Sequence, residues 1–489
     1  MKKVVVIGAG IGGLASAIRM AAKNYEVTVI EQEAYPGGKM SEIRTEDFRF
    51  DTGPSLLTLP HLVEELFTLV GEKAEDYLII RKLDESCRYF YPEGKKVHAW
   101  TSPEKFSSEL ESKLGEPKEN TLRYLKKAKR LYHFTADLFL FSSLHRMKTF
   151  RNRKAFGTLM RPGLLDPFRS LHQANRKSFQ TREVQQIFDR YATYNGSDPF
   201  RAPATLKIIS HLEHNTGAFF PSGGMYKIAS ELHRLAVRHK VTFRFNTRVN
   251  SLTTANGKVT GVEAGDLHVP ADIVISDVDI HHFKRQFLNQ EVRRKEQPEL
   301  SSSALIFFWG MDTCSNETGL HNIFFSANYM EEFRMLFSQS AISDDPTIYL
   351  YISSKMEAND APPGKENWFV MVNAPADNGQ NWDNLIERTR RHIITKLEAQ
   401  LNMELEKHIL VEKRLTPRDI ERRTSSEAGA LYGSSSNNIF SAFMRHPNFS
   451  KQLKGLYFTG GSVHPGGGIP LCLASAKIVS DMIPKEYRP

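Results

Sequence analysis

The sequence predicts an α/β fold built around a parallel sheet, and two stretches of the 489-residue chain carry this prediction. Near the N-terminus, the short β-branched run at residues 4–7 is followed by Gly8, Gly10 and Gly13 and then by a helical pattern. Near the C-terminus, an apolar run at residues 456–459 ends in glycines and continues into a second helical pattern. Units that pass from a strand through a glycine turn into a helix are typical of parallel sheets covered by helices.

Each glycine of the N-terminal unit has a separate task. Gly8 allows the tight turn, Gly10 lets the backbone approach a pyrophosphate, and Gly13 lets the helix pack close to the strand. The helix N-terminus then presents N–H groups and a partial positive charge to phosphates. The next predicted strand, residues 27–30, ends at Glu31, about 20 residues further on, where an acid is expected to accept hydrogen bonds from ribose hydroxyls. Glycines also mark ordinary turns, but strand, helix, second strand and acid together predict dinucleotide binding.

Between the two units, apolar spacing divides the chain into a mainly helical region and a region rich in strands. No internal repeat and no long linker separates autonomous units, so we expect interleaved domains. We assign the nucleotide-binding domain to 1–75, 215–290 and 430–489, a mixed-sheet substrate domain to 76–104 and 291–429, and a helical subdomain to 105–214. Helices are predicted at 105–114, 119–131, 182–194, 383–401 and 471–478, and strands at 241–245, 248–253, 257–262, 271–276, 303–308, 347–352 and 368–373.

Composition narrows the class of protein. The hydrophobic fraction of 40% and the charged fraction of 25% are ordinary for a globular chain. No apolar run is long enough to predict a membrane-spanning helix, and the N-terminus does not resemble a signal peptide. Cys87, Cys314 and Cys472 are scattered, and their spacing predicts neither a metal site nor a disulfide framework. We therefore expect a protein of the reducing cytoplasm.

Positive charge is concentrated in one stretch. The net charge is +9, and residues 146–180 contain Asp166 as their single acid among many basic side chains. Large apolar residues alternate with these charges, a composition typical of segments that lie in a membrane interface. The alternatives are a solvated basic surface on a helical subdomain and a nucleic-acid site, but no nucleic-acid motif accompanies the stretch. We predict that the helical subdomain at 105–214 faces a membrane, with which the protein associates peripherally, and that the protein has no nucleic-acid partner. The basic residues are Arg146, Lys148, Arg151, Arg153, Lys154, Arg161, Arg169, Arg176 and Lys177.

Two further motifs resemble a known flavoprotein superfamily. Gly37-Gly38-Lys39, just past the second strand, resembles the double-glycine extension of the amine oxidase and phytoene desaturase superfamily. The segment Phe-Asp-Thr-Gly-Pro-Ser at residues 50–55 resembles the part of that superfamily that runs under the flavin. The resemblance implies FAD as the cofactor. It places Gly38, Lys39, Ser55 and Leu56 at the cofactor.

The C-terminal stretch resembles a narrower family. The motif His-Pro-Gly-Gly-Gly-Ile-Pro at residues 464–470 resembles the signature of bacterial carotenoid desaturases of the phytoene desaturase type, which other flavin amine oxidases lack. Residues 194–199 and 217–225 look like that family's middle motifs, so the resemblance covers essentially the whole chain. It adds five residues to the expected FAD site, namely Val249, Asp277, Leu431, Gly461 and Ile469.

The resemblance implies an FAD-dependent carotenoid desaturase. The middle segments most resemble the branch that acts on 1-hydroxylated carotenoids at the 3,4 bond. Asp277 stands where the family usually has Asn, and residues 461–463 and 471–473 also depart from the phytoene desaturase pattern. Three alternatives stay open: a phytoene or lycopene desaturase, a soluble amine oxidase, and a non-catalytic escort protein of the same fold that binds a lipid chain. The intact glycine motif, Glu31 and Gly38 favour a bound flavin.

No side chain stands out as the catalytic group. A conjugated polyene can spread a developing positive charge, so the reaction needs no strong protein nucleophile, although some base must take a proton. His211 and His214 could share one helix face, but no third ligand follows at metal-binding spacing, so we predict no metal site. His464 lies among Pro and Gly in the expected flavin loop, which favours a role in loop structure over proton transfer.

Overall fold

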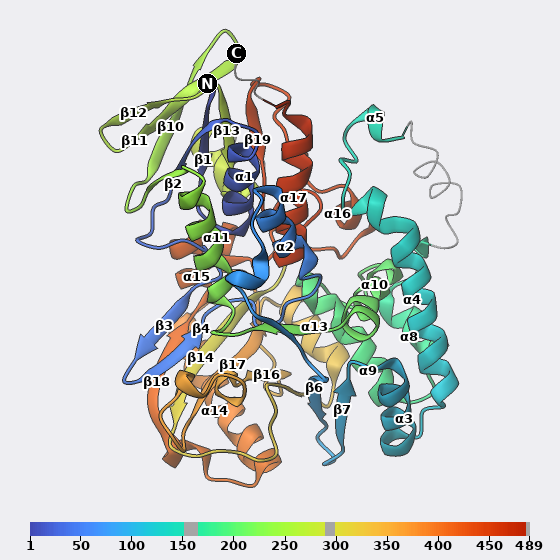
Figure 1. Cartoon of the computed structure of the whole chain (residues 1–489). Coiled ribbons are helices and arrows are strands. Elements are labelled where there is room, and N and C mark those ends of the chain that lie inside the picture. Colours follow the sequence, from blue (N-terminus) through green and yellow to red (C-terminus); the bar gives the residue numbers. More distant parts are fainter. Residues whose placement is uncertain (151–164, 289–298, 486–489) are drawn as a thin grey trace.

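Five parallel strands form the sheet predicted from the two glycine units, in the order β19-β13-β1-β2-β9. A computed structural model describes residues 1–150, 165–288 and 299–485 of the chain (Figure 1). Helix α1 (Ile11–Ala21) packs between α11 (Tyr226–Arg238) and α17 (Ile469–Met482) on this sheet. The sheet draws its strands from three separate parts of the chain: β1 (Lys3–Ile7), β2 (Glu26–Ile30), β9 (Thr242–Arg244), β13 (Ile273–Ser276) and β19 (Leu456–Phe458).

A second, mixed sheet has seven strands in the order β18-β14-β17-β16-β15-β6-β7. Its neighbours are antiparallel except for the parallel pair β15 and β6. Helix α14 (Trp382–Leu401) packs its apolar face against β14 and β17, and these elements share one buried core. The strands are β6 (Glu85–Phe90), β7 (Lys96–Trp100), β14 (Ser303–Met311), β15 (His321–Phe324), β16 (Ile348–Tyr351), β17 (Glu366–Ala374) and β18 (Ile409–Leu415).

Three small sheets and several further helices complete the described part of the fold. The small sheets pair β3 (Glu42–Thr45) with β4 (Phe48–Asp51), β5 (Ile80–Lys82) with β8 (Phe219–Pro221), and β10 (Val249–Ala255) with β11 (Lys258–Ala264) and β12 (Leu267–Pro270). The further helices are α2 (His61–Leu69), α12 (Ile280–Phe287), α13 (Tyr329–Ser338), α15 (Pro417–Thr424) and α16 (Ile439–Phe443).

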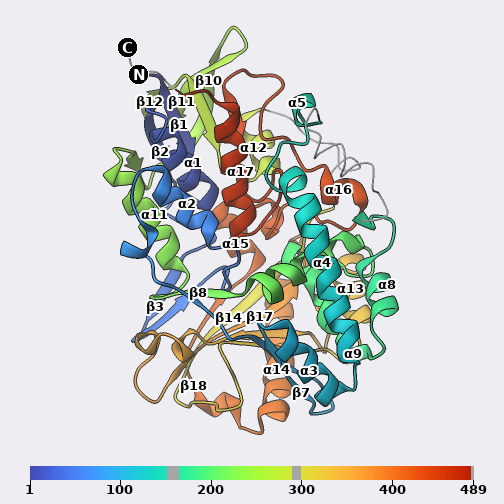
Figure 2. The same ribbon diagram turned by 45° about the vertical axis from the view of Figure 1, so that its right-hand side comes forward.

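The predicted helical region forms a layer beside the mixed sheet (Figure 2). Helix α3 (Pro103–Leu114) begins earlier than predicted because the Ser102 side chain caps it, accepting from Lys105 N–H. The helix predicted at 182–194 divides into α9 (Arg182–Asp189) and a 3-10 segment, Arg190–Asn195. The other helices here are α4 (Lys118–Phe139), which runs eight residues past its predicted end, α5 (Met147–Phe150), α8 (Leu171–Ser178) and α10 (Ile208–His211). Within the described ranges, no helix is both long and apolar enough to cross a membrane.

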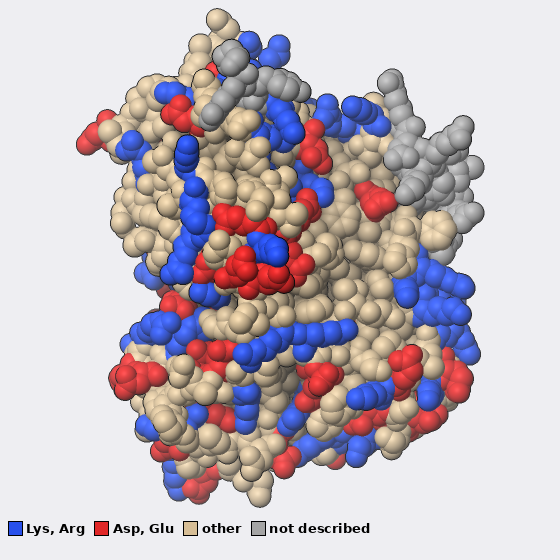
Figure 3. Space-filling view, viewed as in Figure 1, with Lys and Arg blue, Asp and Glu red and all other residues tan. Residues whose placement is uncertain are grey.

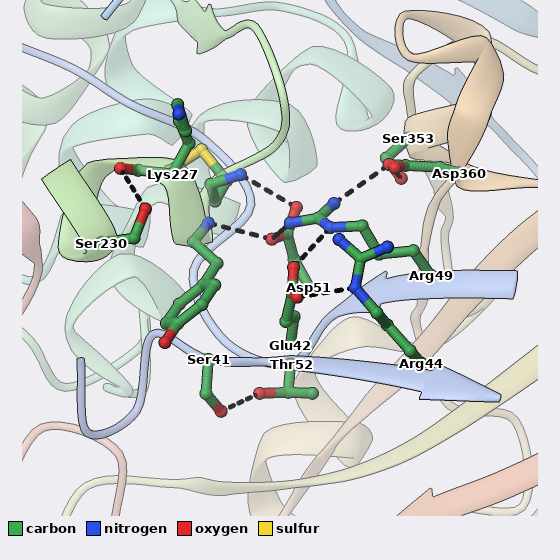
Figure 4. Close-up of polar contacts among 12 residues, drawn as sticks. Ser41, Glu42, Arg44, Arg49, Asp51, Thr52, Lys227, Ser230, Ser353 and Asp360 are labelled. Carbon is green, nitrogen blue, oxygen red and sulfur yellow. Dashed lines mark hydrogen bonds and ion pairs between the residues drawn. The ribbon is translucent and has the colours of Figure 1, made fainter. Parts of the chain in front are cut away.

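A buried ion cluster joins the two halves of the molecule (Figure 4). Asp51, at the end of β4, accepts a hydrogen bond from Arg49 Nη2 at 2.7 Å. Its carboxylate also accepts from the backbone N–H groups of Met225 and Tyr226, each at 3.0 Å, where α11 begins. Arg49 Nη1 reaches Asp360 Oδ2 at 3.1 Å, beside the mixed sheet. The neighbouring carboxylates hold the pKa of the Arg49 guanidinium above its usual value in spite of burial.

Asp51→Ala should therefore destabilise the fold strongly. The substitution leaves the N–H groups at the start of α11 unpaired and removes one partner of a buried ion pair, which costs about 3–5 kcal/mol. The free energy of unfolding from urea titration measures this loss. Glu75→Ala is the control, because Glu75 lies on the surface and pairs with Lys73 only at 3.9 Å, an arrangement worth about 1 kcal/mol or less. Equal stability of the two variants would contradict a joining role for Asp51.

Candidate functional site

A continuous cavity extends from the carboxyl edge of the parallel sheet to the mixed sheet. It contains twelve of the thirteen residues predicted for the cofactor, although their contacts with a cofactor remain a prediction. Gly13 is the thirteenth: a Cβ on Gly13 would lie 2.1 Å from the Gly8 carbonyl oxygen, so its predicted role in close packing matches the structure. The predicted residues on the cavity wall are Gly8, Gly10, Glu31, Gly38, Lys39, Ser55, Leu56, Val249, Asp277, Leu431, Gly461 and Ile469.

The end of the cavity beside the parallel sheet, called the first end below, is lined by the carboxylate of Glu31. Glu31 Oε2 accepts from Ala9 N–H at 2.7 Å, and Oε1 accepts from Glu33 N–H at 2.9 Å. The side chain is buried, and burial raises its pKa while the backbone donors oppose the rise. A carboxylate has about four acceptor positions, so Glu31 retains capacity for further donors at the end of β2.

Asp277 lies at the N-terminus of α1, directly after β13. Its Oδ2 atom accepts from Gly13 N–H at 2.9 Å, and a Cβ on Gly10 would come within 2.4 Å of the same oxygen. Burial, and then the charge of Glu31, raise the pKa of Asp277 to about 7, against the opposing effects of Gly13 N–H and Lys39. The carboxyl group thus lies at the end of a helix that attracts anions, yet burial makes its ionised form less favourable than that of an exposed Asp.

Lys39 connects the double-glycine segment to the segment before the C-terminal loop. Its Nζ donates to the carbonyl oxygens of Leu431 at 2.7 Å and Ala430 at 3.2 Å. Burial lowers the pKa of Lys39, and Asp279 is the strongest of the charges that oppose this shift. The two segments, distant in sequence, therefore meet on one side of the cavity.

His464 structures the C-terminal loop, as predicted. Its Nε2 atom lies 2.9 Å from the carbonyl oxygen of Ser142, and Asn448 Nδ2 donates to the His464 carbonyl at 2.7 Å. Burial lowers the pKa of His464 to about 4, which keeps the ring neutral. His211 and His214 pack against different rings: His211 against Tyr132 at 4.9 Å and His214 against Phe106 at 4.3 Å between ring centroids.

The other end of the cavity is a polar cluster that no sequence motif indicated. Glu213 accepts from Tyr194 Oη at 2.6 Å and from Ser86 Oγ at 2.8 Å, and its Oε2 lies 3.5 Å from Arg190 Nη2. The 3-10 segment Arg190–Asn195 places Arg190 and Tyr194 on the cavity wall. The members come from β6, the 3-10 segment and residues 212–216, so only the fold brings them together.

A hydrogen-bonded chain continues this polar end toward the predicted flavin segment. Tyr349 Oη lies 2.5 Å from Ser55 Oγ and 2.8 Å from His321 Nδ1. All three residues line the cavity. Burial lowers the pKa of His321 to about 3, so its ring is neutral.

Comparison with known proteins decides the family. The family model described as "Flavin containing amine oxidoreductase" matches residues 11–483. The chain belongs to this family. Its fold is the mixed α/β fold of flavin amine oxidases, its cofactor is FAD, and it is an FAD-dependent oxidoreductase. The predicted superfamily and cofactor are thus confirmed.

Relatives along the whole chain are named for carotenoid chemistry. A "1-hydroxycarotenoid 3,4-desaturase" of Flavobacterium sp. is 44% identical and covers 99% of each chain. A "4,4'-diapolycopene oxygenase" of Methylomonas sp. is 32% identical over 99% of this chain and 98% of the relative. Among solved structures, an oxidoreductase from Methanosarcina mazei matches with a TM-score of 0.64 at 16% identity, covering 98% of this chain and 100% of the other. At that identity the structural match shows the fold alone.

The raised pKa of Asp277 predicts a pH-dependent stability of the cofactor-free protein. An unfolded Asp ionises near pH 4 and the folded one near pH 7, so the folded state binds the extra proton between these values. The free energy of unfolding should fall as pH rises through this window, by about 1.4 kcal/mol for each unit of pKa shift. Asp277→Asn cannot ionise, and its side-chain oxygen can still accept from Gly13 N–H.

Thermal unfolding at two pH values tests this expectation. Asp277→Asn should be more stable than the wild type at about pH 8, and the difference should disappear at about pH 4. Asp272→Asn is the control, because Asp272 lies at the opposite end of β13 and its Oδ2 accepts from an exposed backbone N–H of Lys3. A stability difference that is the same at both pH values would contradict the raised pKa of Asp277.

Proposed function

We propose that this protein is an FAD-dependent carotenoid desaturase that forms the 3,4 double bond of a 1-hydroxylated carotenoid. The observation that carries the proposal is 44% identity over 99% of the chain to a relative with that printed name. A cavity that joins a nucleotide-type glycine loop to a partly apolar interior supports it. The phytoene-type desaturase and the non-catalytic escort protein are alternatives that the experiments below distinguish.

The residues of the first end fit FAD. The residue before α1, Gly10, has no side chain that could cap the helix, and Asp277 binds the Gly13 N–H further along, so a pyrophosphate could approach the backbone at Gly10. Glu31 would hold the ribose hydroxyls with its remaining acceptor positions, and Val249 would contact the adenine through its backbone. Gly461, in the C-terminal loop, and Ile469, the first residue of α17, would hold the opposite side of the flavin. When bound, FAD supplies the hydride acceptor for removing hydrogen from carbon.

The chain's own residues would position the polyene and exclude water. Apolar side chains from β14, β15 and β17 line the middle of the cavity, where a hydrocarbon can lie without losing hydrogen bonds. These residues are Ala304, Ile306, Ile323, Phe369 and Met371.

A second candidate function is oxygenation of a carotenoid end group. It is favoured by the Methylomonas relative and by a Staphylococcus aureus relative, 31% identical, named "4,4'-diaponeurosporene oxygenase". Desaturation removes two hydrogens, whereas oxygenation adds oxygen, so the mass of the product separates the two functions.

Glu31→Ala should weaken FAD binding. Loss of the hydrogen bonds of a buried polar group costs about 1–3 kcal/mol, which raises the Kd for FAD roughly ten- to a hundredfold. Quenching of FAD fluorescence on titration into cofactor-free protein measures the Kd. Glu26→Ala, an exposed residue of the same strand, is the control. An unchanged Kd in Glu31→Ala would remove Glu31 from the ribose site.

Product analysis tests the reaction. Purified protein with FAD and liposomes should convert a 1-hydroxylated carotenoid to its 3,4-desaturated product much faster than it converts phytoene. Chromatography with mass detection should show the loss of two hydrogens and no gain of oxygen. Efficient conversion of phytoene without turnover of the hydroxylated compound would overturn the substrate assignment, and an oxygenated product would favour the second function.

We further propose that the α4–α5–α16 side of the molecule contacts a membrane. Phe139, at the end of α4, packs on Phe443 of α16 with ring centroids 5.0 Å apart. Met147, at the start of α5, is 80% exposed, and Met444, directly after α16, is 55% exposed. Lys and Arg side chains gather along the edge formed by α4 (Figure 3). Part of the predicted basic stretch, with Arg151, Arg153, Lys154 and Arg161, lies outside the described residues.

Charge reversal on α5 tests membrane contact. Arg146→Glu with Lys148→Glu should weaken binding to phosphatidylglycerol vesicles by at least about tenfold, because each basic residue near an anionic surface contributes about 1 kcal/mol. Co-sedimentation at low and high salt measures the binding. Reversal of the exposed Lys413 and Arg414 on β18 is the control. Equal binding by both double variants would place the membrane contact elsewhere.

A further inference from the structure

Three buried polar atoms on the cavity wall have no hydrogen-bond partner in the part of the chain that the structure describes. They are Arg190 Nε, His321 Nε2 and Tyr329 Oη. The exposed fractions of these residues are 8%, 4% and 8%. A buried polar atom without a partner costs about 1–3 kcal/mol, and such atoms are uncommon in native interiors. Because all three residues line the same cavity, they indicate a ligand that supplies the missing hydrogen bonds.

His321 is the best oriented of the three. Its ring lies nearly parallel to those of Tyr349 and Tyr351, at 17° and 15°, with centroids 6.1 Å and 5.3 Å away. The Nδ1 atom of His321 is hydrogen-bonded to Tyr349 Oη, which is also hydrogen-bonded to Ser55 Oγ. A neutral imidazole has one N–H and one bare nitrogen. With Nδ1 occupied, Nε2 is free to donate or accept at the cavity wall, whichever tautomer is present.

The charges around this wall favour a neutral ligand group. Arg190 is paired with Glu213 at 3.5 Å and donates through Nη2 to Tyr89 Oη at 2.8 Å. Its positive charge is therefore already matched, and its buried Nε–H group still lacks an acceptor among the described residues. A carboxylate or phosphate would bring an unmatched charge to this buried place, which costs more than a neutral group. A hydroxyl group can both accept from Arg190 and exchange a hydrogen bond with His321.

The position of His321 also fits the chemistry of the proposed function. In a 1-hydroxylated carotenoid, a single carbon separates the hydroxyl-bearing carbon from the 3,4 bond. The partner of that hydroxyl must therefore lie beside the reacting carbons and not at a remote end of the cavity. His321 is linked through Tyr349 to Ser55, which lies in the segment expected to run along the flavin.

We propose that His321 Nε2 binds the C1 hydroxyl of the substrate and thereby selects hydroxylated over unmodified carotenoids. Arg190 Nε and Tyr329 Oη complete the hydroxyl site, and Tyr349 and Ser55 are positioning residues for the His321 ring. The inference rests on the proposed function, because it names the group that this cavity recognises. An unmodified hydrocarbon would leave all three atoms unpaired, and sites built around a substrate hydroxyl discriminate strongly against analogues that lack it.

The test compares a 1-hydroxylated carotenoid with the same carotenoid lacking the hydroxyl. Protein whose FAD has been reduced beforehand is titrated with each compound without oxygen, so that no hydride can be transferred, and quenching of the protein's tryptophan fluorescence reports binding. The wild type should bind the hydroxylated compound at least about tenfold more tightly. His321→Phe keeps an aromatic ring between the tyrosines but should abolish the preference. Tyr349→Phe should reduce it and raise KM for the hydroxylated substrate more than it lowers kcat.

His211→Phe is the matched control. His211 is equally buried at 4% exposed and also has an unpartnered ring nitrogen, but it does not line the cavity. This variant should keep the preference and the FAD content of the wild type. If His321→Phe does not fold, as judged by FAD content, Tyr349→Phe carries the test.

The outcomes separate the two proposals. Equal binding of the two compounds by the wild type, or a preference that survives in both His321→Phe and Tyr349→Phe, would overturn the hydroxyl site. A preference lost in these variants supports the site. If the preference depends on His321 while the wild type desaturates neither compound, the hydroxyl site stands and the proposed reaction falls.

Discussion

The carboxylate of Asp51 is the constraint on which the arrangement of the cavity depends. It accepts hydrogen bonds from Arg49, from the first N–H groups of α11 and from Tyr351 Oη of the mixed sheet. The buried Asp51 carboxylate thereby links α11, which covers the parallel sheet, to Tyr351 of the mixed sheet. The chain continues directly from Asp51 to Ser55, so this link also fixes the segment in the middle of the cavity.

Ser55 connects the Asp51 carboxylate to the polar end of the cavity. Ser55 is hydrogen-bonded to Tyr349, and Tyr349 is hydrogen-bonded to His321, so the position of the His321 ring depends on that of Ser55. One end of the cavity is then the glycine loop at the start of α1, and the other carries buried polar atoms that lack a partner among the described residues, beside apolar walls. This polarity pattern suits a long hydrocarbon with a hydroxyl near its reacting bond.

The cofactor end could be predicted from sequence because it is built from local patterns. One strand–turn–helix–strand unit contains Gly8, Gly10, Gly13 and Glu31, and the spacing of these residues along the chain predicts that unit. Arg190, His321 and Tyr349 come from three stretches with no shared motif. Pairing of β15 with β16 brings His321 beside Tyr349, and the 3-10 segment brings Arg190 to Tyr89 of the neighbouring strand β6. The split of the helix at 182–194 was also missed, since its apolar spacing continues through the 3-10 segment that carries Arg190. The departure at Asp277 was visible in the sequence, but its raised pKa arises from burial beside Glu31.

The central claim is that this cavity places a hydroxylated polyene against the flavin so that hydrogen passes directly to the cofactor. The most direct measurement mixes FAD-loaded protein with a 1-hydroxylated carotenoid without oxygen, removes the carotenoid by extraction, and compares the amount of desaturated product with the amount of reduced flavin. The account predicts that the flavin is reduced in a single turnover, with one desaturated product formed for each reduced flavin. A flavin that stays oxidised while the carotenoid is bound would contradict it.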